Sequence, residues 1–392
     1  MVRRISIFGS TGSIGRNTVS LVAGRSDLRT VAISGASNIG LLAAQARRLR
    51  AEIAVTGDTA RLADLRDALA GSGIEAAAGP EALLEAASRP VDWAMSAIVG
   101  AAGLPVSLAL ARQGGTLALA NKESLVCAGI LLRDECAKAG TRLLPVDSEH
   151  SAIFQALNGE RREEVERIIL TASGGPFRDW TRARMATATV AEAVAHPNWS
   201  MGQRISIDSA TLFNKAMELI ETKELFSFPE DRIEVVVHPQ SIIHSMVGFH
   251  DGSIIAQLGP PDMKGAIGYA LNFPKRLNLP VERLDFKVLS EFSFHEVDDE
   301  RFPAIGIARD VAAIGGLAGA AFNAAKEAAL DAFISRQIGF LQMADLVEEA
   351  LTRSSGRLAN GRESYALPDV LAIDRDVRQI GAGIAAEMAI EA

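Results

Sequence analysis

The sequence predicts a three-part α/β protein: a doubly wound parallel sheet at the N-terminus, an α+β part with a mostly antiparallel sheet, and a small helical part at the C-terminus. Three observations predict this organisation. Short β-rich segments alternate with helical segments up to about residue 147, which is typical of a parallel sheet. Further on, an Asp-Gly pair lies between two β-rich segments, which indicates an antiparallel hairpin. Beyond Phe302 the chain is Ala-rich and helical in pattern.

The length of 392 residues exceeds the size at which one hydrophobic core keeps growing, so two or three domains are expected. The hydrophobic content of 48% is sufficient for well-buried cores. We predict domains at 1–147, 148–274 and 301–392. The stretch 275–300, which contains Pro and many charged residues, is predicted to be a linker.

The predicted strands of the first part are short and lie between segments that fit amphipathic helices. They are 5–8, 30–34, 53–56, 93–96, 116–120 and 142–146. In a doubly wound sheet, ligands bind at the carboxyl ends of the strands. Polar residues that follow these strands are therefore candidates for a binding site.

The predicted strands of the second part are 168–171, 233–237, 241–247 and 253–258, and the last two are joined across Asp251-Gly252. The predicted helical stretches beyond them are 306–334, 343–351 and 374–391. The Ala/Gly-rich segment 311–325 is closely flanked by charged residues. It is therefore predicted to be a buried packing helix and not a membrane span.

The charge balance excludes several classes of partner. The net charge of −8 and pI near 5.4 come without a long basic run, which argues against nucleic acid. No 18-residue apolar stretch free of charge occurs, so no membrane is expected. Cys127 and Cys136 have neither disulfide-framework nor zinc-site spacing. Because the first strand begins almost at Met1, without room for a signal peptide, we expect a cytoplasmic protein.

A glycine-rich turn follows the first predicted strand. Gly9, Gly12 and Gly15 lie in the run Gly-Ser-Thr-Gly-Ser-Ile-Gly, and a predicted helix begins there. A strand that leads through such a turn into a helix places backbone N–H groups around a dinucleotide pyrophosphate. The spacing differs from the commoner G-x-G-x-x-G, but the order of strand, turn and helix predicts a Rossmann-like nucleotide-binding fold.

The end of the second strand indicates which dinucleotide binds. An NAD enzyme usually has a carboxylate there for the ribose 2′-hydroxyl, whereas no carboxylate occurs between Asp27 and Glu52. The strand ends instead in Ala36-Ser37-Asn38, which leaves room for a 2′-phosphate. We therefore expect NADP(H), with an ordinary polar loop as the alternative interpretation.

Two polar clusters follow the last two strands of the parallel sheet. Asn121-Lys122-Glu123 follows one strand, and Asp147-Ser148-Glu149-His150 follows the next. Two carboxylates with no nearby His or Cys cluster suit a hard cation such as Mg²⁺ or Mn²⁺. Helix capping explains an Asp and a Ser before a helix equally well. This segment alone does not decide between the two interpretations.

A second carboxylate-bearing segment lies in the α+β part. We expect a capped helix to begin at 208–211 and to place Asn214, Glu218 and Glu221 on one face, with Lys215 three residues before Glu218. The stripe fits a solvated face held by a Lys–Glu pair worth about 0.3 kcal/mol. It also fits a third metal-binding carboxylate, with Ser209, Asn214 and Lys215 binding a phosphate.

Two loops have compositions that suit binding. The turn Ser173-Gly174-Gly175 offers a hydroxyl and unobstructed backbone N–H groups that can bind a phosphate. The loop 196–202 carries the imidazole of His196 and the indole of Trp199 and is bounded by Pro197 and Gly202. Because a large indole on an exposed loop is costly unless it covers something, we interpret this loop as a lid, with packing on the domain surface as the alternative.

Taken together, these motifs resemble those of the 1-deoxy-D-xylulose 5-phosphate reductoisomerase family. The match spans nearly the whole chain in order. It comprises the segments 9–15, 120–124, 145–152, 173–177, 196–202, 208–215 and 237–245. The resemblance implies a homodimer that uses NADPH and Mg²⁺ or Mn²⁺, with Co²⁺ as a further candidate. Such an enzyme converts 1-deoxy-D-xylulose 5-phosphate to 2-C-methyl-D-erythritol 4-phosphate in the non-mevalonate route to isoprenoids.

The resemblance also implies roles for individual residues. Contacts to NADPH are expected from Thr11, Gly12, Ser13, Ile14, Ala36, Ser37, Asn38, Asn121, Glu123 and Gly202. The metal ligands are expected to be Asp147, Glu149 and Glu218, which with Lys122 form the catalytic set. Substrate contacts are expected from Lys122, Ser148, Glu149, Ser173, His196, Trp199, Met201, Ser209, Asn214, Lys215 and Glu218.

Two departures and two rival hypotheses stand beside this interpretation. Many relatives carry Gly followed by Lys or Arg where this chain has Ala36-Ser37, which weakens the argument for the 2′-phosphate. Gly265-Ala266 stands where a Pro-Ile step is usual, which puts the start of a local helix in doubt. One rival is a metal-assisted NADP-dependent dehydrogenase of another phosphorylated polyol. The other is a catalytically silent nucleotide sensor, against which the intact carboxylate trio argues.

Overall fold

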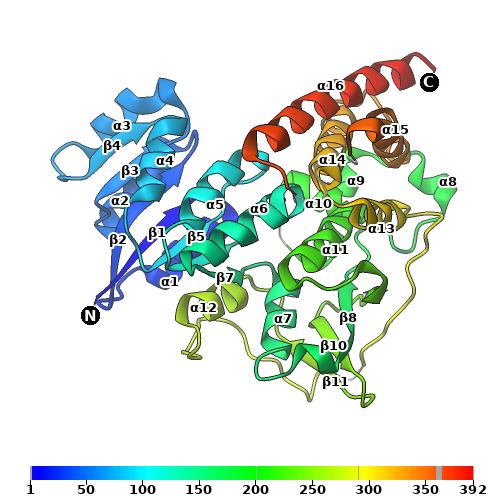
Figure 1. The fold of residues 1–392 in the computed structure, drawn as a ribbon, viewed down its shortest axis with the longest axis horizontal. Helices are drawn as coiled ribbons and strands as arrows, with labels where there is room; N and C mark the ends of the chain where they lie inside the picture. The colour runs from blue at the N-terminus through cyan, green and yellow to red at the C-terminus, as the bar shows by residue number, and fades with distance from the viewer. Residues whose placement is uncertain (1, 200, 290, 359–363, 392) are drawn as a thin grey trace. The chain divides into compact units, whose positions relative to one another are not determined.

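The computed structural model describes residues 2–199, 201–289, 291–358 and 364–391 (Figure 1). The chain forms two compact units, and both are discontinuous in sequence. Unit 1 comprises Met1–Ser124, Leu132–Ser151 and Asp262–Glu282, and unit 2 comprises Leu125–Leu131, Ala152–Pro261 and Arg283–Ala392. The predicted functional division at residues 147, 274 and 300 remains a prediction.

Unit 1 contains a seven-stranded sheet in which all strand pairs are parallel, with the order β4-β3-β2-β1-β5-β6-β7. The order reverses beside β1, so the prediction of a doubly wound parallel sheet is confirmed. The strands are β1 Arg3–Phe8, β2 Leu28–Gly35, β3 Ile53–Thr56, β4 Glu75–Ala78, β5 Trp93–Ser96, β6 Thr116–Leu119 and β7 Arg142–Pro145. The edge strand β4 was not predicted from the sequence.

The helices of unit 1 flank this sheet. Right-handed crossovers place the helices between β1 and β4 on one face and the helices after β4 on the other. In agreement, α2 packs on α1 and α3, whereas α4 packs on α5. The helices are α1 Ser13–Val22, α2 Ile39–Leu49, α3 Leu62–Leu69, α4 Pro80–Ser88, α5 Leu104–Ala111 and α6 Glu123–Ala139, of which residues 125–131 count with unit 2. Helix α7 (Ser148–Ala156) follows β7 and is divided between unit 1 and unit 2 after Ser151.

Helix α12 (Lys264–Asn272) also belongs to unit 1 and packs against α1, β6 and β7. The buried indole of Trp93 donates to the carbonyl of Ala270 at 3.1 Å, and Arg3 Nη1 donates to the carbonyl of Leu271 at 2.5 Å. A helix forms here although Gly265-Ala266 replaces the usual Pro-Ile step. A segment distant in sequence therefore completes the core of the parallel sheet.

Unit 2 contains a four-stranded sheet with the order β11-β10-β8-β9. Strand β10 pairs antiparallel with β8 and β11, and only β8 and β9 are parallel, which confirms a mostly antiparallel sheet. Gly252, with φ +87°, lies in the predicted β10–β11 turn, and Asp251 Oδ1 accepts from Ser253 N at 2.8 Å. The strands are β8 Val165–Ala172, β9 Ile233–Val237, β10 Ile243–Phe249 and β11 Ile254–Leu258.

The helices of unit 2 include α10 Gln203–Ala210, α11 Phe213–Phe226, α13 Ala304–Ile314, α14 Ala318–Ile334, α15 Gln342–Leu358 and α16 Leu367–Glu391, and short helices α8 Arg182–Met185 and α9 Val190–Ala193. Helix α11 packs on β8, β9 and α13, whereas α14, α15 and α16 pack on one another. The predicted continuous helix 306–334 is wrong: Gly315 and Gly316, both with positive φ, separate α13 from α14. In the part of the chain that the structure describes, no helix has the length and apolar character needed to cross a membrane.

Candidate active site

The glycine-rich turn after β1 has the geometry that an anion site needs. Gly9 has φ +87°, and a Cβ there would overlap the carbonyl of Ala97. A Cβ on Gly15 would overlap the carbonyl of Gly9, so the start of α1 can approach the strand only with glycine here. Gly12 is the exposed N-cap of α1, has no side-chain cap and is followed by no acidic residue in the first turn. The N–H groups of this helix end therefore face outward beside Thr11, Ser13 and Ile14.

The turn after β2 lies next to the glycine-rich turn because β2 is the neighbour of β1. Ala36, Ser37 and Asn38 are exposed, and Asn38 caps α2 by accepting from Leu41 N at 3.1 Å. Thr56 Oγ1 donates to the carbonyl of Ala36 at 2.7 Å and holds the turn in place. A fixed turn without a carboxylate is the arrangement expected for NADP(H), but its role in binding remains a prediction.

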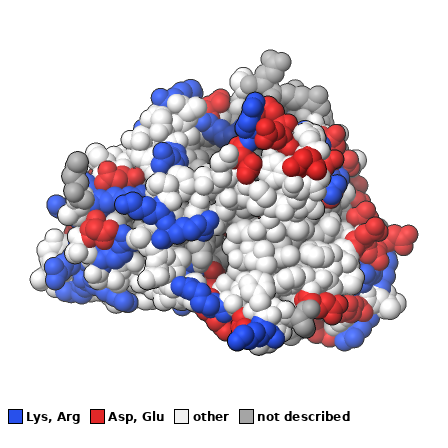
Figure 2. Space-filling model, turned by 90° about the horizontal axis from the view of Figure 1, so that it is seen from below, with Lys and Arg blue, Asp and Glu red and all other residues white. Residues whose placement is uncertain are grey.

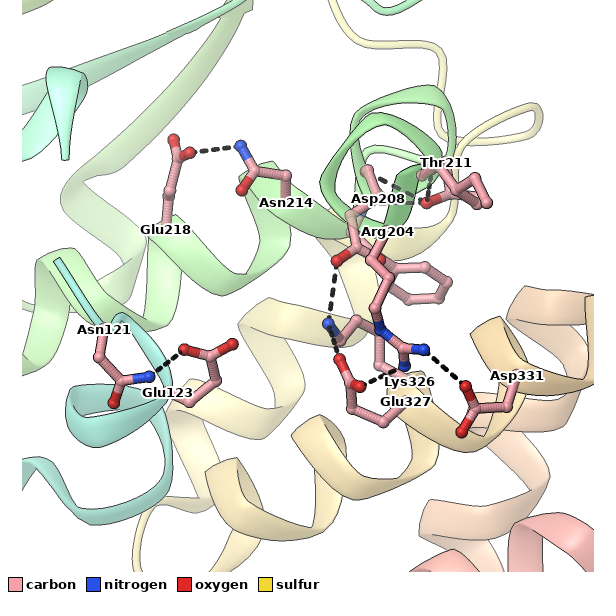
Figure 3. Close-up of polar contacts among 12 residues, drawn as sticks. Asn121, Glu123, Arg204, Asp208, Thr211, Asn214, Glu218, Lys326, Glu327 and Asp331 are labelled. Atoms are coloured by element: carbon pink, nitrogen blue, oxygen red, sulfur yellow. Dashed lines mark hydrogen bonds and ion pairs between the residues drawn. The ribbon is translucent and has the colours of Figure 1, made fainter. Parts of the chain in front are cut away.

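Asn121 and Glu123, after β6, are held rigidly. Asn121 is 2% exposed, and its Nδ2 donates to the carbonyl of Gly100 at 3.0 Å and to Glu123 Oε2 at 2.6 Å (Figure 3). Its Oδ1 accepts from Ser124 N at 3.1 Å at the start of α6. These side chains are therefore fixed at the carboxyl edge of the sheet before any ligand binds.

In the cluster after β7, the carboxylate of Asp147 lies beside an ammonium group and an imidazole ring. Asp147 Oδ2 lies 3.5 Å from Lys122 Nζ and 3.0 Å from His150 Nδ1. Ser148 Oγ donates to Glu149 within the first turn of α7. Because Asp147 directly precedes α7, the capping interpretation stays open beside the metal interpretation. Within unit 1, Lys122 and Asp147 do meet as two predicted catalytic residues.

The helix start predicted at 208–211 is wrong. Helix α10 ends at Ala210 and α11 begins at Phe213, with Leu212 in the left-handed region at φ +59° between them. Thr211 Oγ1 donates to the carbonyls of Ile207 and Asp208 and accepts from Phe213 N at 3.3 Å, which joins the two helices. Consequently Ser209 lies in the last turn of α10.

The carboxylate stripe of α11 is buried. Glu218 is 1% exposed and accepts from Asn214 Nδ2 at 2.5 Å and from the buried Lys215. Glu221 is equally buried, so the alternative of a solvated face is wrong. The physical reason is that α11 packs against the sheet and α13. Because buried charges are costly, such a cluster is a strong candidate for a functional site.

The glycine turn after β8 lies against the end of α10. Gly174 and Gly175 have φ +82° and +64°, and Gly175 N donates to Ser173 Oγ at 3.1 Å. A Cβ on Gly175 would lie 2.7 Å from the carbonyl oxygen of Ser209. The two predicted phosphate-binding segments therefore pack directly on each other within unit 2.

His196 connects the predicted lid to this turn. Its Nδ1 accepts from the backbone N–H of Trp199 at 2.9 Å and of Asn198 at 3.2 Å, so the proton of the neutral ring is assigned to Nε2. Nε2 lies 2.9 Å from Ser173 Oγ, to which it donates. Burial lowers the pKa of His196 below its ordinary value of 6.5, which favours this neutral form.

The remainder of the predicted lid packs beside the start of β10. The half-buried Trp199 has its ring centre 6.2 Å from that of His244, and Asn198 Nδ2 donates to the carbonyl of Pro239 at 2.5 Å. Met201 is half-buried and Gly202 is the N-cap of α10, whereas Ser200 lies outside the described residues. Closure of this loop over a substrate remains a prediction.

A buried ion network next to the α10–α11 corner was missed from the sequence (Figure 3). Lys326 of α14 donates to Asp208 of α10 at 2.9 Å, and both side chains are buried. Lys326 lies in an Ala-rich helix whose pattern gave no indication of a partner more than 100 residues away. The Arg204–Asp331 pair is the exposed end of the same network.

Comparison with known proteins decides the family. Models named "1-deoxy-D-xylulose 5-phosphate reductoisomerase" and its C-terminal domain match residues 5–129 and 143–226, and "DXP reductoisomerase C-terminal domain" matches residues 258–380. The chain is 62% identical to the reductoisomerase of Ruegeria pomeroyi over 90% of its length and 89% of that protein's. It is 59% identical to that of a Jannaschia species over 96% of both. The chain belongs to the 1-deoxy-D-xylulose 5-phosphate reductoisomerase family.

Solved reductoisomerase structures share the whole fold. The Zymomonas mobilis enzyme, solved in complex with NADPH, is 47% identical and has a TM-score of 0.92, with coverage of 98% of this chain and 99% of that one. A reductoisomerase in complex with NADPH, fosmidomycin and magnesium is 38% identical, with a TM-score of 0.92 and coverage of 98% of each chain. The predicted fold class and family resemblance are therefore confirmed.

Proposed function

We propose that this chain catalyses the rearrangement and NADPH-dependent reduction of 1-deoxy-D-xylulose 5-phosphate to 2-C-methyl-D-erythritol 4-phosphate. The reaction requires a divalent cation and supplies precursors for isoprenoids by the non-mevalonate route. The observation that carries this conclusion is membership of the reductoisomerase family over nearly the full length of the chain. The buried Lys215–Glu218 pair, with the half-buried Asn214 beside it, supports the proposal, because buried charged groups are costly and often belong to functional sites.

NADPH supplies the hydride in this reaction. Its pyrophosphate is proposed to bind at the N-terminus of α1 through Thr11, Gly12, Ser13 and Ile14, where unobstructed N–H groups face outward. The remaining proposed contacts are Ala36, Ser37 and Asn38 at the adenosine end and Asn121, Glu123 and Gly202 at the nicotinamide end. A relative solved in complex with NADPH supports the choice of cofactor.

The divalent cation is proposed to bind Asp147, Glu149 and Glu218. Three carboxylates suit Mg²⁺ or Mn²⁺, and Co²⁺ is a further candidate. Solved relatives contain magnesium. The donor chemistry fits such a cation because all three residues offer carboxylate oxygens, the ligands that hard divalent cations prefer. When bound, the cation polarises the substrate oxygens. Lys122, which contacts Asp147, contributes positive charge beside the reacting atoms.

The substrate phosphate is proposed to bind where the glycine turn meets the α10–α11 corner. Ser173, Ser209, Asn214 and Lys215 supply hydrogen-bond donors there, and His196 holds the Ser173 hydroxyl in position. Ser148 and Glu149 are proposed to contact the sugar, with Trp199 and Met201 on the loop that closes. Binding energy from the remote phosphate then drives closure and excludes water from the reacting atoms.

A homodimer is proposed, with β11 as the candidate interface. This edge strand exposes Ile254 by 49% and Ile255 by 37%. Figure 2, which views the side on which Figure 1 draws β10 and β11, shows a broad area without charged side chains. An uncharged edge strand of this kind pairs readily with a second copy. A reducing, cytoplasmic location is also proposed, and the two buried cysteines, Cys127 and Cys136, are compatible with it.

Incubation of the protein with NADPH, Mg²⁺ and 1-deoxy-D-xylulose 5-phosphate tests the proposal. We expect oxidation of NADPH and a branched 2-C-methyl-D-erythritol 4-phosphate product, identified by NMR of its carbon skeleton. A reduced product with the unbranched skeleton of the substrate would instead identify the rival dehydrogenase of phosphorylated polyols. Binding of NADPH without any turnover would identify a silent nucleotide sensor.

A further inference from the structure

A network of five charged side chains joins α10 to α14. Asp208 Oδ2 accepts from Lys326 Nζ at 2.9 Å, and Lys326 also donates to Glu327 Oε1 at 2.6 Å. Arg204, one turn before Asp208, donates to Glu327 and to Asp331 Oδ1, the latter at 2.6 Å. We name these five residues the α10–α14 ion network, and Figure 3 shows four of its contacts as dashed lines.

Stability is a poor explanation for the inner part of this network. The side chains of Asp208 and Lys326 are only 8% and 3% exposed, and buried ion pairs seldom stabilise a fold more than apolar side chains of similar volume. Asp208 Oδ1, also buried, has no hydrogen-bond partner among the described residues. Burial raises the pKa of the Asp208 carboxyl, although Lys326 opposes this effect. The pair therefore imposes a cost that a structural role alone does not justify.

The place of the network in the fold suggests what the cost achieves. Helix α10 runs from Gly202, where the His196 loop ends, to the corner before α11. Asp208 directly precedes Ser209, whose carbonyl lies against Gly175 of the glycine turn. Through Thr211 the same corner is bonded to Phe213, at the start of the helix that carries Asn214 and Lys215. The three segments proposed to bind phosphate therefore all meet at the end of α10.

We propose that the α10–α14 ion network positions the substrate's phosphate-binding groups. Its directional contacts fix the axial position of α10 on α14, and thereby the position of Ser209 relative to the glycine turn. Interdigitated apolar side chains restrain the helix as well, but the ion pairs add contacts between fixed partners that favour one axial position. Asp208 and Lys326 are thus positioning residues that never touch the substrate. The inference rests on the proposed function, since it assumes that Ser209 binds phosphate.

Single substitutions within the buried pair test this inference. Asp208→Asn and Lys326→Met each leave one side of the pair unbalanced. We expect each to raise the KM for 1-deoxy-D-xylulose 5-phosphate about tenfold, to change kcat by less than threefold and to leave the KM for NADPH unchanged. In the double variant no charge of the pair is left unbalanced, so thermal stability should recover while the KM for substrate stays raised. A double variant with the KM of the wild type would show that the pair serves stability alone.

Further variants and one direct binding measurement complete the test. Asp331→Asn removes only the exposed end of the network. Because Asp331 is a surface residue, we expect this variant to fold, and its KM for substrate should rise two- to threefold. Glu387→Gln breaks an exposed pair with Arg353 between α15 and α16 and should change nothing. Calorimetry with inorganic phosphate should show weaker binding to Asp208→Asn than to wild type. Equal phosphate binding by both proteins would overturn the inference.

Failure of the two proposals can be distinguished. A wild-type protein that does not turn over 1-deoxy-D-xylulose 5-phosphate contradicts the proposed function, whereas the phosphate measurement still tests the network. An active wild-type enzyme whose Asp208→Asn variant has an unchanged KM for substrate contradicts the network alone. An equal rise in the KM for NADPH and for substrate would indicate general disorder and would also contradict a positioning role.

Discussion

Replacement of His196 by Ala is the most direct test of the loop geometry. The change removes the ring nitrogen that accepts from Trp199 N and Asn198 N, as well as the donor to Ser173 Oγ. The loop then loses the contacts that hold its backbone next to the glycine turn. We expect binding of 1-deoxy-D-xylulose 5-phosphate to weaken, whereas binding of NADPH should not change.

The magnitude follows from the hydrogen bonds lost. A buried N–H group left without an acceptor costs about 1–3 kcal/mol, and the half-buried environment of His196 favours the lower end of that range. Two such groups give about 2 kcal/mol. Because about 1.4 kcal/mol corresponds to a factor of ten in affinity, the KM for substrate should rise about thirtyfold. His196→Asn keeps an acceptor close to the position of Nδ1, so its KM should rise by less than tenfold.

Steady-state kinetics with varied substrate at saturating NADPH measure the effect. His295→Ala, which removes an exposed histidine outside the loop, is the matched control and should behave as wild type. Equal effects of Ala and Asn at position 196 would refute the argument from the Nδ1 acceptor. An unchanged KM in the Ala variant would refute any role of His196 in holding the loop.

Four further predictions concern the remaining parts of the site. Glu149→Gln and Glu218→Gln should each abolish turnover, restored by no concentration of Mg²⁺, while calorimetric NADPH binding persists; activity in both variants would remove them from the ligand set. Gly15→Ala should destabilise the fold and abolish NADPH binding, because the added Cβ overlaps the Gly9 carbonyl. Gly12→Ala, in which the Cβ has room, should keep the melting temperature of the apo protein within a few degrees of wild type and weaken only NADPH binding. Trp199→Ala should raise the KM for substrate, and unchanged kinetics would exclude a lid. Since burial lowers the pKa of His196, its contribution to substrate binding should be fully present above pH 6.5 and be lost as the pH falls through the lowered pKa. The KM for substrate should therefore rise at acidic pH, and a rise that begins above pH 6.5 would contradict this prediction.

Regular elements could be predicted where pattern and local chemistry agree. The strands 53–56, 93–96 and 233–237 were predicted at the bounds that the structure has, because they are rich in β-forming residues. A Gly or a Pro within two residues also ends the first and the last of them. Strand β4 was missed because its sequence Glu-Ala-Ala-Ala is typical of a helix, and only pairing with β3 makes it a strand. Local propensity was overridden there by tertiary contact.

The α10–α11 corner shows a different limit. Asp208-Ser209 has the composition of a helix N-cap, yet it lies near the end of α10 because Leu212 adopts a left-handed conformation that a leucine rarely has. The identities of Ser173, His196 and Glu218 as candidates could be read from residue types and spacing. The contact of Lys326 with Asp208 could not, since nothing local specifies which of many lysines meets a buried carboxylate. For Lys215 and Glu218, the sequence fitted either a solvated face or a binding site, and the burial of both side chains excludes the solvated face.

The packing of α12 on the parallel sheet has a consequence for anyone who dissects this enzyme. A polypeptide that stops at residue 147 would lack the carbonyls of Ala270 and Leu271, and thereby leave the indole of Trp93 without its acceptor and the faces of β6 and β7 uncovered. The nucleotide-binding half should consequently aggregate when expressed by itself. Truncation of the chain after residue 147 should therefore not give a soluble nucleotide-binding domain. A fusion that joins residues 262–282 to this fragment through a short linker should give a monodisperse protein.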